Sequence, residues 1–394
     1  MKKTKSLSFP LLISITILFT LSFTLTGCFS SGTTVNTAGN AISAQNHIEK
    51  VIKITKDESD EYVTSLAFGN DILWIGTEHF LYSVLPYTPA EDRRIKKYID
   101  AADNCKINSI NVKDEKVYIA GFEGFSYFNG QSWERQPIGN SNEIIPVGND
   151  LWSATNSGAE ILRNNSGEWR KLDVSSATSY SPTKQMQSIG TDGTNYLWLG
   201  TLFGLHRFDL AAHKEFMGKL SAGSVDSESL NTNHFWKRLY GDYQSPMGGM
   251  VANEKGNCPL TGNNIQKIKF DKENNRYLFC TKNGLSILKK GQWTTYKGTG
   301  SHLVAGLNGE MKTQQRTGNL NIPTPEIYDI ISFEGKLYLA TRSGLGILTE
   351  SDKSSQLITL ETGLPSNDVT SLAIDVKQKT LFIGTASGIG IMKL

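Results

Sequence analysis

The sequence predicts an all-β fold in which seven blades, each of four short antiparallel strands, form a closed ring, the architecture of a β-propeller. Three observations predict it. One strand motif recurs seven times along the chain, each copy lies between further short apolar strands, and the chain ends one strand short of a complete last repeat. Repeats of about this length that carry several strands are typical of propeller blades.

The recurring motif consists of an apolar residue, an aromatic, usually an aliphatic, a small residue and then threonine. Five close copies and two looser ones follow one another: Leu73–Thr77, Val117–Gly121, Leu151–Thr155, Leu197–Thr201, Tyr277–Thr281, Leu337–Thr341 and Leu381–Thr385. In six copies a glycine stands three residues after the last position of the motif, and the first copy has Phe80 there. Glycine between two apolar runs indicates a hairpin turn, because such turns need positive φ.

Each motif is the second strand of a four-strand unit. An apolar run such as Val369–Ile374 precedes it, and a run such as Gly284–Leu288 follows it. A fourth segment often carries a tryptophan, as at Trp133, Trp169 and Trp293. We expect the tryptophans at these repeated positions to pack in the core.

Two spacings between successive motifs exceed one repeat. Thr201 and Thr281 are 80 residues apart, and Thr281 and Thr341 are 60 apart, whereas the other spacings run from 34 to 46. We interpret the excess as insertions at about residues 221–262 and 298–325. A degenerate eighth blade is the alternative for the longer gap.

The two ends of the repeat region complement each other. The chain ends at Gly388–Leu394, the third strand of its last repeat, and an unassigned strand, His47–Ile54, precedes the first repeat. This N-terminal strand can supply the missing outer strand of the last blade. Pairing of this kind removes exposed sheet edges, which invite aggregation. The sequence therefore predicts seven blades closed by an N-terminal outer strand.

Part of the repeat resembles a known family. Thr362–Val369, which leads into Leu381–Thr385, is similar to the two-component regulator propeller repeat, and Ser229–Trp236 opens in the same way. The resemblance covers about residues 48–394. It implies an extracytoplasmic, sensory propeller, and we expect a stand-alone lipoprotein form without a kinase.

Residues 1–27 are predicted to be a lipoprotein signal peptide. Three lysines precede an apolar run from Leu7 to Leu25, which ends in a Leu-Thr-Gly-Cys sequence that resembles the bacterial lipobox. The resemblance implies cleavage before Cys28 and attachment of lipid to its thiol, which holds a chain on the membrane without a spanning helix. A plain transmembrane anchor is the alternative, although Pro10 and several serines and threonines interrupt the run.

The segment after the signal peptide indicates location and tethering. Phe29 stands where inner-membrane lipoproteins have aspartate, so we expect the outer membrane or periplasm in preference to the inner membrane. Residues 28–46 are small and polar, which is typical of a flexible tether, and residues 47–394 form the propeller. Removal of the signal peptide changes the formal net charge from +2 to −1. Such a chain has no electrostatic footprint for nucleic acid.

A binding face follows from the strand order. In an antiparallel blade the turns between the second and third strands share one face with the connections from the fourth strand to the next blade. We expect both insertions to be fourth–first connections on this face. The candidate ligand or partner residues are Glu78, His79, Phe122, Glu123, Asn156, Phe203, Trp236, Lys282, Asn283 and Arg342. Aromatic, amide and charged groups together suit a polar small molecule or a protein partner.

Trp236 is the one tryptophan that we place outside the repeat pattern. With Phe235, Tyr240 and Tyr243 it could stack on a sugar ring or fill a small core of the insertion itself. Both interpretations put it on the binding face.

Three cysteines remain after Cys28. An oxidising compartment favours one disulfide and one buried thiol. Cys105 and Cys258 lie in loop segments and are the candidate disulfide pair, whereas Cys280 lies in an apolar strand and is expected in the core.

Two functional hypotheses result. The first is a membrane-anchored binding, scaffold or sensory module whose partner is a protein or a glycan. The alternative is a lyase or hydrolase with Glu78, His79 and Glu123 at the mouth of the channel. The sequence shows no metal-ligand spacing, calcium loop, nucleophile elbow or phosphate loop, so we expect neither a metal nor a cofactor.

Overall fold

The computed structural model describes residues 47–54, 62–101, 105–136, 139–162, 169–172, 185–221, 235–241, 256–305, 311–320 and 322–394. The predicted signal peptide, Cys28 and the predicted tether lie outside these residues. In the part of the chain that the structure describes, no helix is both long and apolar enough to cross a membrane.

The described strands form seven four-stranded sheets and one two-stranded hairpin. Blade 1 contains β2 (Val63–Gly69), β3 (Ile72–Thr77), β4 (Leu81–Val84) and β5 (Ile95–Tyr98). Blade 2 contains β6 (Ile107–Lys113), β7 (Lys116–Gly121), β8 (Gly124–Phe128) and β9 (Trp133–Gln136). Blade 3 contains β10 (Ser141–Val147), β11 (Asp150–Thr155), β12 (Gly158–Leu162) and β13 (Trp169–Leu172). Blade 4 contains β14 (Met186–Thr191), β15 (Tyr196–Thr201), β16 (Gly204–Asp209) and β17 (Trp236–Leu239).

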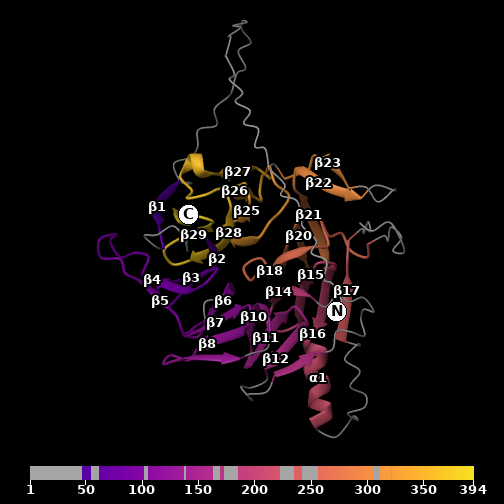
Figure 1. The fold of residues 1–394 in the computed structure, drawn as a ribbon. Coiled ribbons are helices and arrows are strands. Elements are labelled where there is room, and N and C mark those ends of the chain that lie inside the picture. The colour runs from indigo at the N-terminus through magenta and orange to yellow at the C-terminus, as the bar shows by residue number, and fades with distance from the viewer. Residues whose placement is uncertain are drawn as a thin grey trace, which may run out of the picture. The chain divides into compact units, whose positions relative to one another are not determined.

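The remaining three blades complete the ring (Figure 1). Blade 5 contains β18 (Ile265–Asp271), β19 (Arg276–Thr281), β20 (Gly284–Lys289) and β21 (Gln292–Lys297). Blade 6 contains β24 (Asp329–Phe333), β25 (Lys336–Thr341), β26 (Gly344–Thr349) and β27 (Ser355–Ile358). Blade 7 contains β28 (Val369–Asp375), β29 (Thr380–Thr385), β30 (Gly388–Lys393) and, as its outer strand, β1 (Ile48–Ile52). The predicted seven-bladed β-propeller is therefore confirmed.

The repeated motif has a physical basis in the turn between the second and third strands. The Thr341 hydroxyl donates a hydrogen bond of 2.7 Å to the Gly344 carbonyl, and Gly344 has φ of 132°. The small residue before the threonine permits close approach of the next blade, because a Cβ atom at Gly200 would lie 2.6 Å from Cγ2 of Ile265. The motif thus encodes both the hairpin and the contact between blades.

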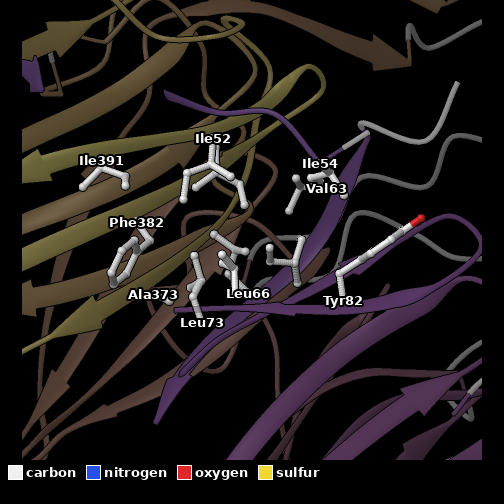
Figure 2. Close-up of a cluster of buried hydrophobic side chains, with 12 residues drawn as sticks. Ile52, Ile54, Val63, Leu66, Leu73, Tyr82, Ala373, Phe382 and Ile391 are labelled. Carbon is white, nitrogen blue, oxygen red and sulfur yellow. The ribbon is translucent and has the colours of Figure 1, made fainter. Parts of the chain in front are cut away.

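The ring closes through the N-terminal strand, as predicted. β1 pairs antiparallel with β30, in a register that runs from Ile48 opposite Met392 to Ile52 opposite Ile389. Ile52 is buried in a cluster that contains residues of both blade 1 and blade 7, among them Leu73 and Phe382 (Figure 2). Closure therefore rests on a continuous apolar core as well as on backbone pairing.

The first insertion differs from the prediction. The helix α1 (Leu210–Ser221) follows the third strand β16 directly, and β17 then pairs with β16 as the fourth strand of blade 4. The interval 221–262 is thus not one fourth–first connection: its first part joins the third strand to the fourth, and the fourth strand lies within it. In the described residues the long gap completes blade 4, which removes the eighth-blade alternative.

The second insertion follows the fourth strand of blade 5. Its described part contains a hairpin of β22 (Gly300–Ala305) and β23 (Met311–Arg316). A short 3₁₀ helix, η6 (Leu360–Thr362), lies in the connection between blades 6 and 7.

Candidate functional site

The strand order defines two faces of the ring. We call the face with the second–third turns and the fourth–first connections the upper face. The lower face carries the first–second turns and the third–fourth connections. The start of α1 and the start of β17 therefore belong to the lower face, whereas the β22–β23 hairpin belongs to the upper face.

The first strands of all seven blades line a central channel of about 660 Å³. One position in each of these strands is equivalent, because it pairs with the small residue of the motif on the second strand. We call these residues the channel ring: Ser65, Ser109, Glu143, Ser188, Lys267, Asp329 and Ser371. Four blades have serine there, and blades 3, 5 and 6 have charged residues.

Channel-ring side chains join blade 3 to blade 4, blade 4 to blade 5 and blade 6 to blade 7. Glu143 accepts hydrogen bonds at one carboxylate oxygen from the Ser188 hydroxyl (2.7 Å) and from the backbone N–H of Ile189 (2.9 Å). Ser188 in turn accepts the N–H of Ile268 at 2.9 Å. Asp329 accepts the N–H of Leu372 at 2.9 Å. In each case the side chain accepts the backbone N–H of a residue in the next blade. That residue directly follows the next blade's own channel-ring residue.

Lys267 cannot accept a hydrogen bond, so the pattern changes at blades 5 and 6. By the pattern of the other blades, the N–H of Ile330 would donate to a side chain of blade 5. It donates instead to the second carboxylate oxygen of Asp329, at 2.9 Å. A buried backbone N–H needs a partner, and this contact within blade 6 supplies it.

The charged groups of the channel are paired with one another. Lys267 Nζ lies 2.6 Å from Glu143 Oε1, across blade 4, and Lys269 Nζ lies 3.3 Å from Asp329 Oδ1. Burial lowers the pKa of Lys267, but the Glu143 and Asp329 carboxylates raise it by more, so the net shift is upward. Burial, with Asp329 close by, raises the pKa of Cys280 well above its usual value. These ion pairs connect blade 3 with blade 5 and blade 5 with blade 6.

A second set of polar residues lies one position before the channel ring. Their side chains also form hydrogen bonds from one blade to the next. Thr64, Asn108 and Asn142 donate to the carbonyl oxygens of Ile107, Ser141 and Met186, over 2.5, 2.9 and 2.7 Å. The Thr370 hydroxyl donates to the Val63 carbonyl over 2.6 Å and so joins blade 7 to blade 1. Sequence reasoning missed both sets. Their signal was available as charged or polar residues at two adjacent positions in or next to every first strand.

The candidate residues on the second–third turns lie on the upper face. They are Glu78, His79, Phe122, Glu123, Asn156, Phe203, Lys282, Asn283 and Arg342. Glu78 pairs with Lys106 at 3.0 Å, and Glu123 pairs with Arg135 at 3.2 Å. Asn156 accepts a hydrogen bond of 2.8 Å from Asn142, which connects it to the channel wall. Phe122 is 64% exposed.

A polar band crosses the upper face of blades 5, 6, 7 and 1. We define it as Lys282, Glu326, Tyr328, Arg342, Asp368 and Tyr62. Lys282 Nζ lies 4.0 Å from Glu326, and the Tyr328 hydroxyl donates to Glu326 over 2.7 Å. Tyr328 and Glu326 raise the pKa of Arg342.

Two further contacts extend the polar band. The Tyr62 hydroxyl donates to Asp368 over 3.5 Å, and Tyr62 is 40% exposed. Tyr328 also lines the channel, so the band continues into the channel mouth. The band presents charged groups of both signs and two phenols on one surface.

Trp236 does not lie on this face, so its placement outside the repeat was wrong. It begins β17, the position at which Trp133 and Trp169 begin β9 and β13. It is 8% exposed, and its ring centroid lies 4.6 Å from that of Phe208. The helix between the third and fourth strands displaced the fourth strand along the sequence and concealed the repeat.

The predicted disulfide is absent from the structure, which does not join Cys105 to Cys258. Cys105 lies beside blade 2, near Phe122 and Phe125, whereas Cys258 packs against the cluster between blades 4 and 5. The two cysteines belong to different parts of the ring, and a disulfide requires Cα atoms within about 7 Å. Cys280 is fully buried in β19.

The residues of the alternative enzyme site are brought to one face but not to one centre. Glu78 and Glu123 each pair with a cation of blade 2, and the ring of His79 packs near Phe80. Within the described residues, no group of three or more His, Cys, Asp or Glu side chains is arranged to hold a metal ion. The geometry shows a polar upper face and a channel whose central charges, Glu143 and Lys267, are ion-paired.

The fold is shared with bacterial extracellular propeller domains. It is similar to the extracellular domain of the hybrid two-component system BT4673 from B. thetaiotaomicron, with a TM-score of 0.61 and 14% identity over 88% of this chain and 40% of that chain. The corresponding domain of BT3049 from the same organism gives 0.58 and 17% over 88% and 42%. No protein-family model matches the chain, and no curated protein matches it.

A third similar structure is PorZ, a surface component of the type-IX secretion system of Porphyromonas gingivalis. The TM-score is 0.53 and the identity 14%, over 85% of this chain and 47% of that chain. The chain thus spans less than half the length of each of these three structures. Fold and repeat together define a seven-bladed β-propeller that resembles the two-component regulator propellers.

Proposed function

We propose that this protein is an extracytoplasmic, membrane-anchored propeller that binds a protein or glycan partner through its upper face. One observation carries the proposal. The charges in the middle of the channel, Glu143, Lys267 and Asp329, are used in contacts between blades, whereas the polar band leaves charged groups and phenols accessible around the channel mouth. Groups that already stabilise the fold are poor candidates for chemistry, and exposed groups of both signs suit recognition.

The comparisons support the location and the class of function. BT4673 and BT3049 are extracellular domains of two-component systems, and PorZ is a bacterial surface component. A sensory or scaffold function on the outer side of the membrane fits this chain, whose N-terminal sequence resembles a lipobox.

A comparison of two faces tests the binding proposal. Arg342→Ala combined with Lys282→Ala removes two cations from the polar band, and Lys379→Ala removes one exposed cation from the lower face, where Lys379 pairs with Glu334. In quantitative affinity purification from membranes and in glycan-binding assays, the upper-face variant should lose its partner and the lower-face variant should retain it. Equal partner recovery from all three proteins would refute the upper face as the binding surface.

A separate variant tests the anchor. Cys28→Ser removes the proposed lipid-attachment thiol, so the protein should leave the membrane fraction or remain unprocessed. A Cys28→Ser protein that stays membrane-bound at its mature size would refute lipid attachment at this residue.

A further inference from the structure

The N-terminal strand fixes the place at which the anchor reaches the ring. Because β1 runs antiparallel to β30, it begins where β30 ends, with Ile48 opposite Met392 and beside Lys393. The described chain therefore begins at the end of β30 that the lower-face turns surround. A lipid anchor at Cys28, 20 positions before Ile48, would thus tether the propeller at this edge of the lower face.

The same edge carries exposed apolar side chains. Leu85 is 56% exposed, Tyr87 45% and Val376 57%. Tyr87 extends from blade 1 to blade 7: its hydroxyl donates to Asp375 over 2.5 Å, and its ring lies 6.4 Å from that of Phe382. Single exposed apolar residues are ordinary, but three at one junction between blades form a patch.

Two lysines border these apolar side chains. Lys393 Nζ lies 6.0 Å from the centre of the Tyr87 ring and donates to the carbonyl of Gln378 at 2.7 Å. Lys377 follows Val376 in the exposed first–second turn of blade 7. In the described part of the chain, neither lysine forms an ion pair with a carboxylate. We define Leu85, Tyr87, Val376, Lys377 and Lys393 as the lower-edge patch.

We infer that the lower-edge patch contacts the surface of the membrane to which the chain is anchored, with its lysines on anionic lipid headgroups. This inference rests on the anchor of the proposed function. Apolar and aromatic side chains flanked by lysines bind the interfacial region of bilayers, where the apolar groups enter and the cations meet phosphates. The patch is also the described surface next to the chain segment that leads to Cys28.

A hollow of mixed polar and apolar lining adjoins the patch at Val376. Its volume is about 400 Å³, and Val376, Ile374, Phe68 and Phe270 are among the residues that line it. The contact also orients the molecule, because the polar band on the upper face then points away from the membrane. Membrane contact and partner binding therefore use different surfaces.

Cysteine accessibility in the intact, lipidated protein tests the inference. Val376→Cys and Leu85→Cys place thiols in the patch, and Ile99→Cys is the matched control, since Ile99 is 66% exposed and lies in the upper-face connection between β5 and β6. Modification by a maleimide polymer slows the protein on a gel, and the additional shift is measured. The unsubstituted protein, which still has the native cysteines, gives the background. In vesicles that contain phosphatidylglycerol, the patch thiols should react about fivefold more slowly than in detergent. The Ile99→Cys thiol should react equally in both.

The lipid dependence adds a second measurement. Lys377→Gln with Lys393→Gln, or vesicles of phosphatidylcholine alone, should abolish most of the protection at position 376, because the electrostatic attraction is lost. Equal modification of positions 376 and 99 in membrane-bound protein would overturn the membrane contact and leave the anchor intact. Protein found in the soluble fraction would overturn the anchor, and with it this inference.

Discussion

Charged side chains occupy two contrasting places in this propeller. In the channel, Glu143 and Lys267 lie 2.6 Å apart with side chains 10% and 19% exposed, and Glu143 also accepts hydrogen bonds from the next blade. On the two faces, pairs such as Glu78 with Lys106 and Glu334 with Lys379 are about half exposed. Charge alone therefore does not indicate function in this fold: the channel charges hold blades together, and the exposed ones are available to partners.

The largest expected effect is the loss of a channel carboxylate. Glu143→Ala leaves Lys267 without its partner and should reduce the free energy of unfolding by about 3 kcal/mol, measured by denaturant titration. Glu334→Ala, at an exposed pair, should cost less than about 1 kcal/mol. The double variant Glu143→Leu with Lys267→Met should recover most of the loss, since it leaves no unpaired charge. If Glu143→Ala and Glu334→Ala lowered the free energy of unfolding equally, the channel charges would not differ from the exposed ones.

Among the described residues His206 is buried without a hydrogen-bond partner at either ring nitrogen, and it should give a pH-dependent effect of similar or smaller size. Burial, with a smaller contribution from Arg238, lowers the pKa of His206 from 6.5 to about 4. The unfolded chain therefore binds this proton first, and stability is lost as the pH falls from about 6.5 to 4, by up to about 3 kcal/mol. His206→Phe should flatten this part of the pH profile of unfolding. Parallel profiles for the two proteins would exclude this assignment.

The hydroxyl of the repeated motif should contribute less. Thr341→Val removes the 2.7 Å hydrogen bond to the Gly344 carbonyl in a fully buried turn and should cost about 1 kcal/mol in thermal or denaturant unfolding. Thr341→Ser keeps the hydroxyl and serves as the control. A valine variant as stable as the serine variant would show that the threonine is not needed to close the turn.

The smallest effect is expected at the exposed pairs of the upper face. Glu78→Gln should change the free energy of unfolding by less than about 1 kcal/mol, and the difference should decrease further with added salt. A loss as large as that of Glu143→Ala would mean that upper-face charges also stabilise the ring.

Much of the fold could be predicted because each blade repeats the same local physics. The hairpin glycines, the buried aromatic strand and the final threonine recur at fixed offsets, and the missing last strand indicated closure by residues 48–52. Blade 4 was the exception. Its helix α1 separates β16 from β17, so Trp236 appeared to lie in an insertion instead of in the core.

The candidate site was predictable only in part. The second–third turns could be assigned to one face from strand order, but the partners of their side chains come from other strands, connections and blades, as with Lys106 and Glu326. The proposed pairing of Cys105 with Cys258 failed for the same reason, because loop position along the chain does not show where two residues lie around the ring.

The sequence by itself determined the repeated second strands, the hairpins that follow them and the outer strand that closes the ring, since these depend on alternation, turn residues and a repeated motif within about 40 residues. Only the tertiary structure decided which polar residues are used inside the ring and which remain accessible. Glu143 and Lys267 are 124 positions apart and meet across blade 4. Contacts of this kind depend on the closed geometry of all seven blades, and no local pattern encodes it.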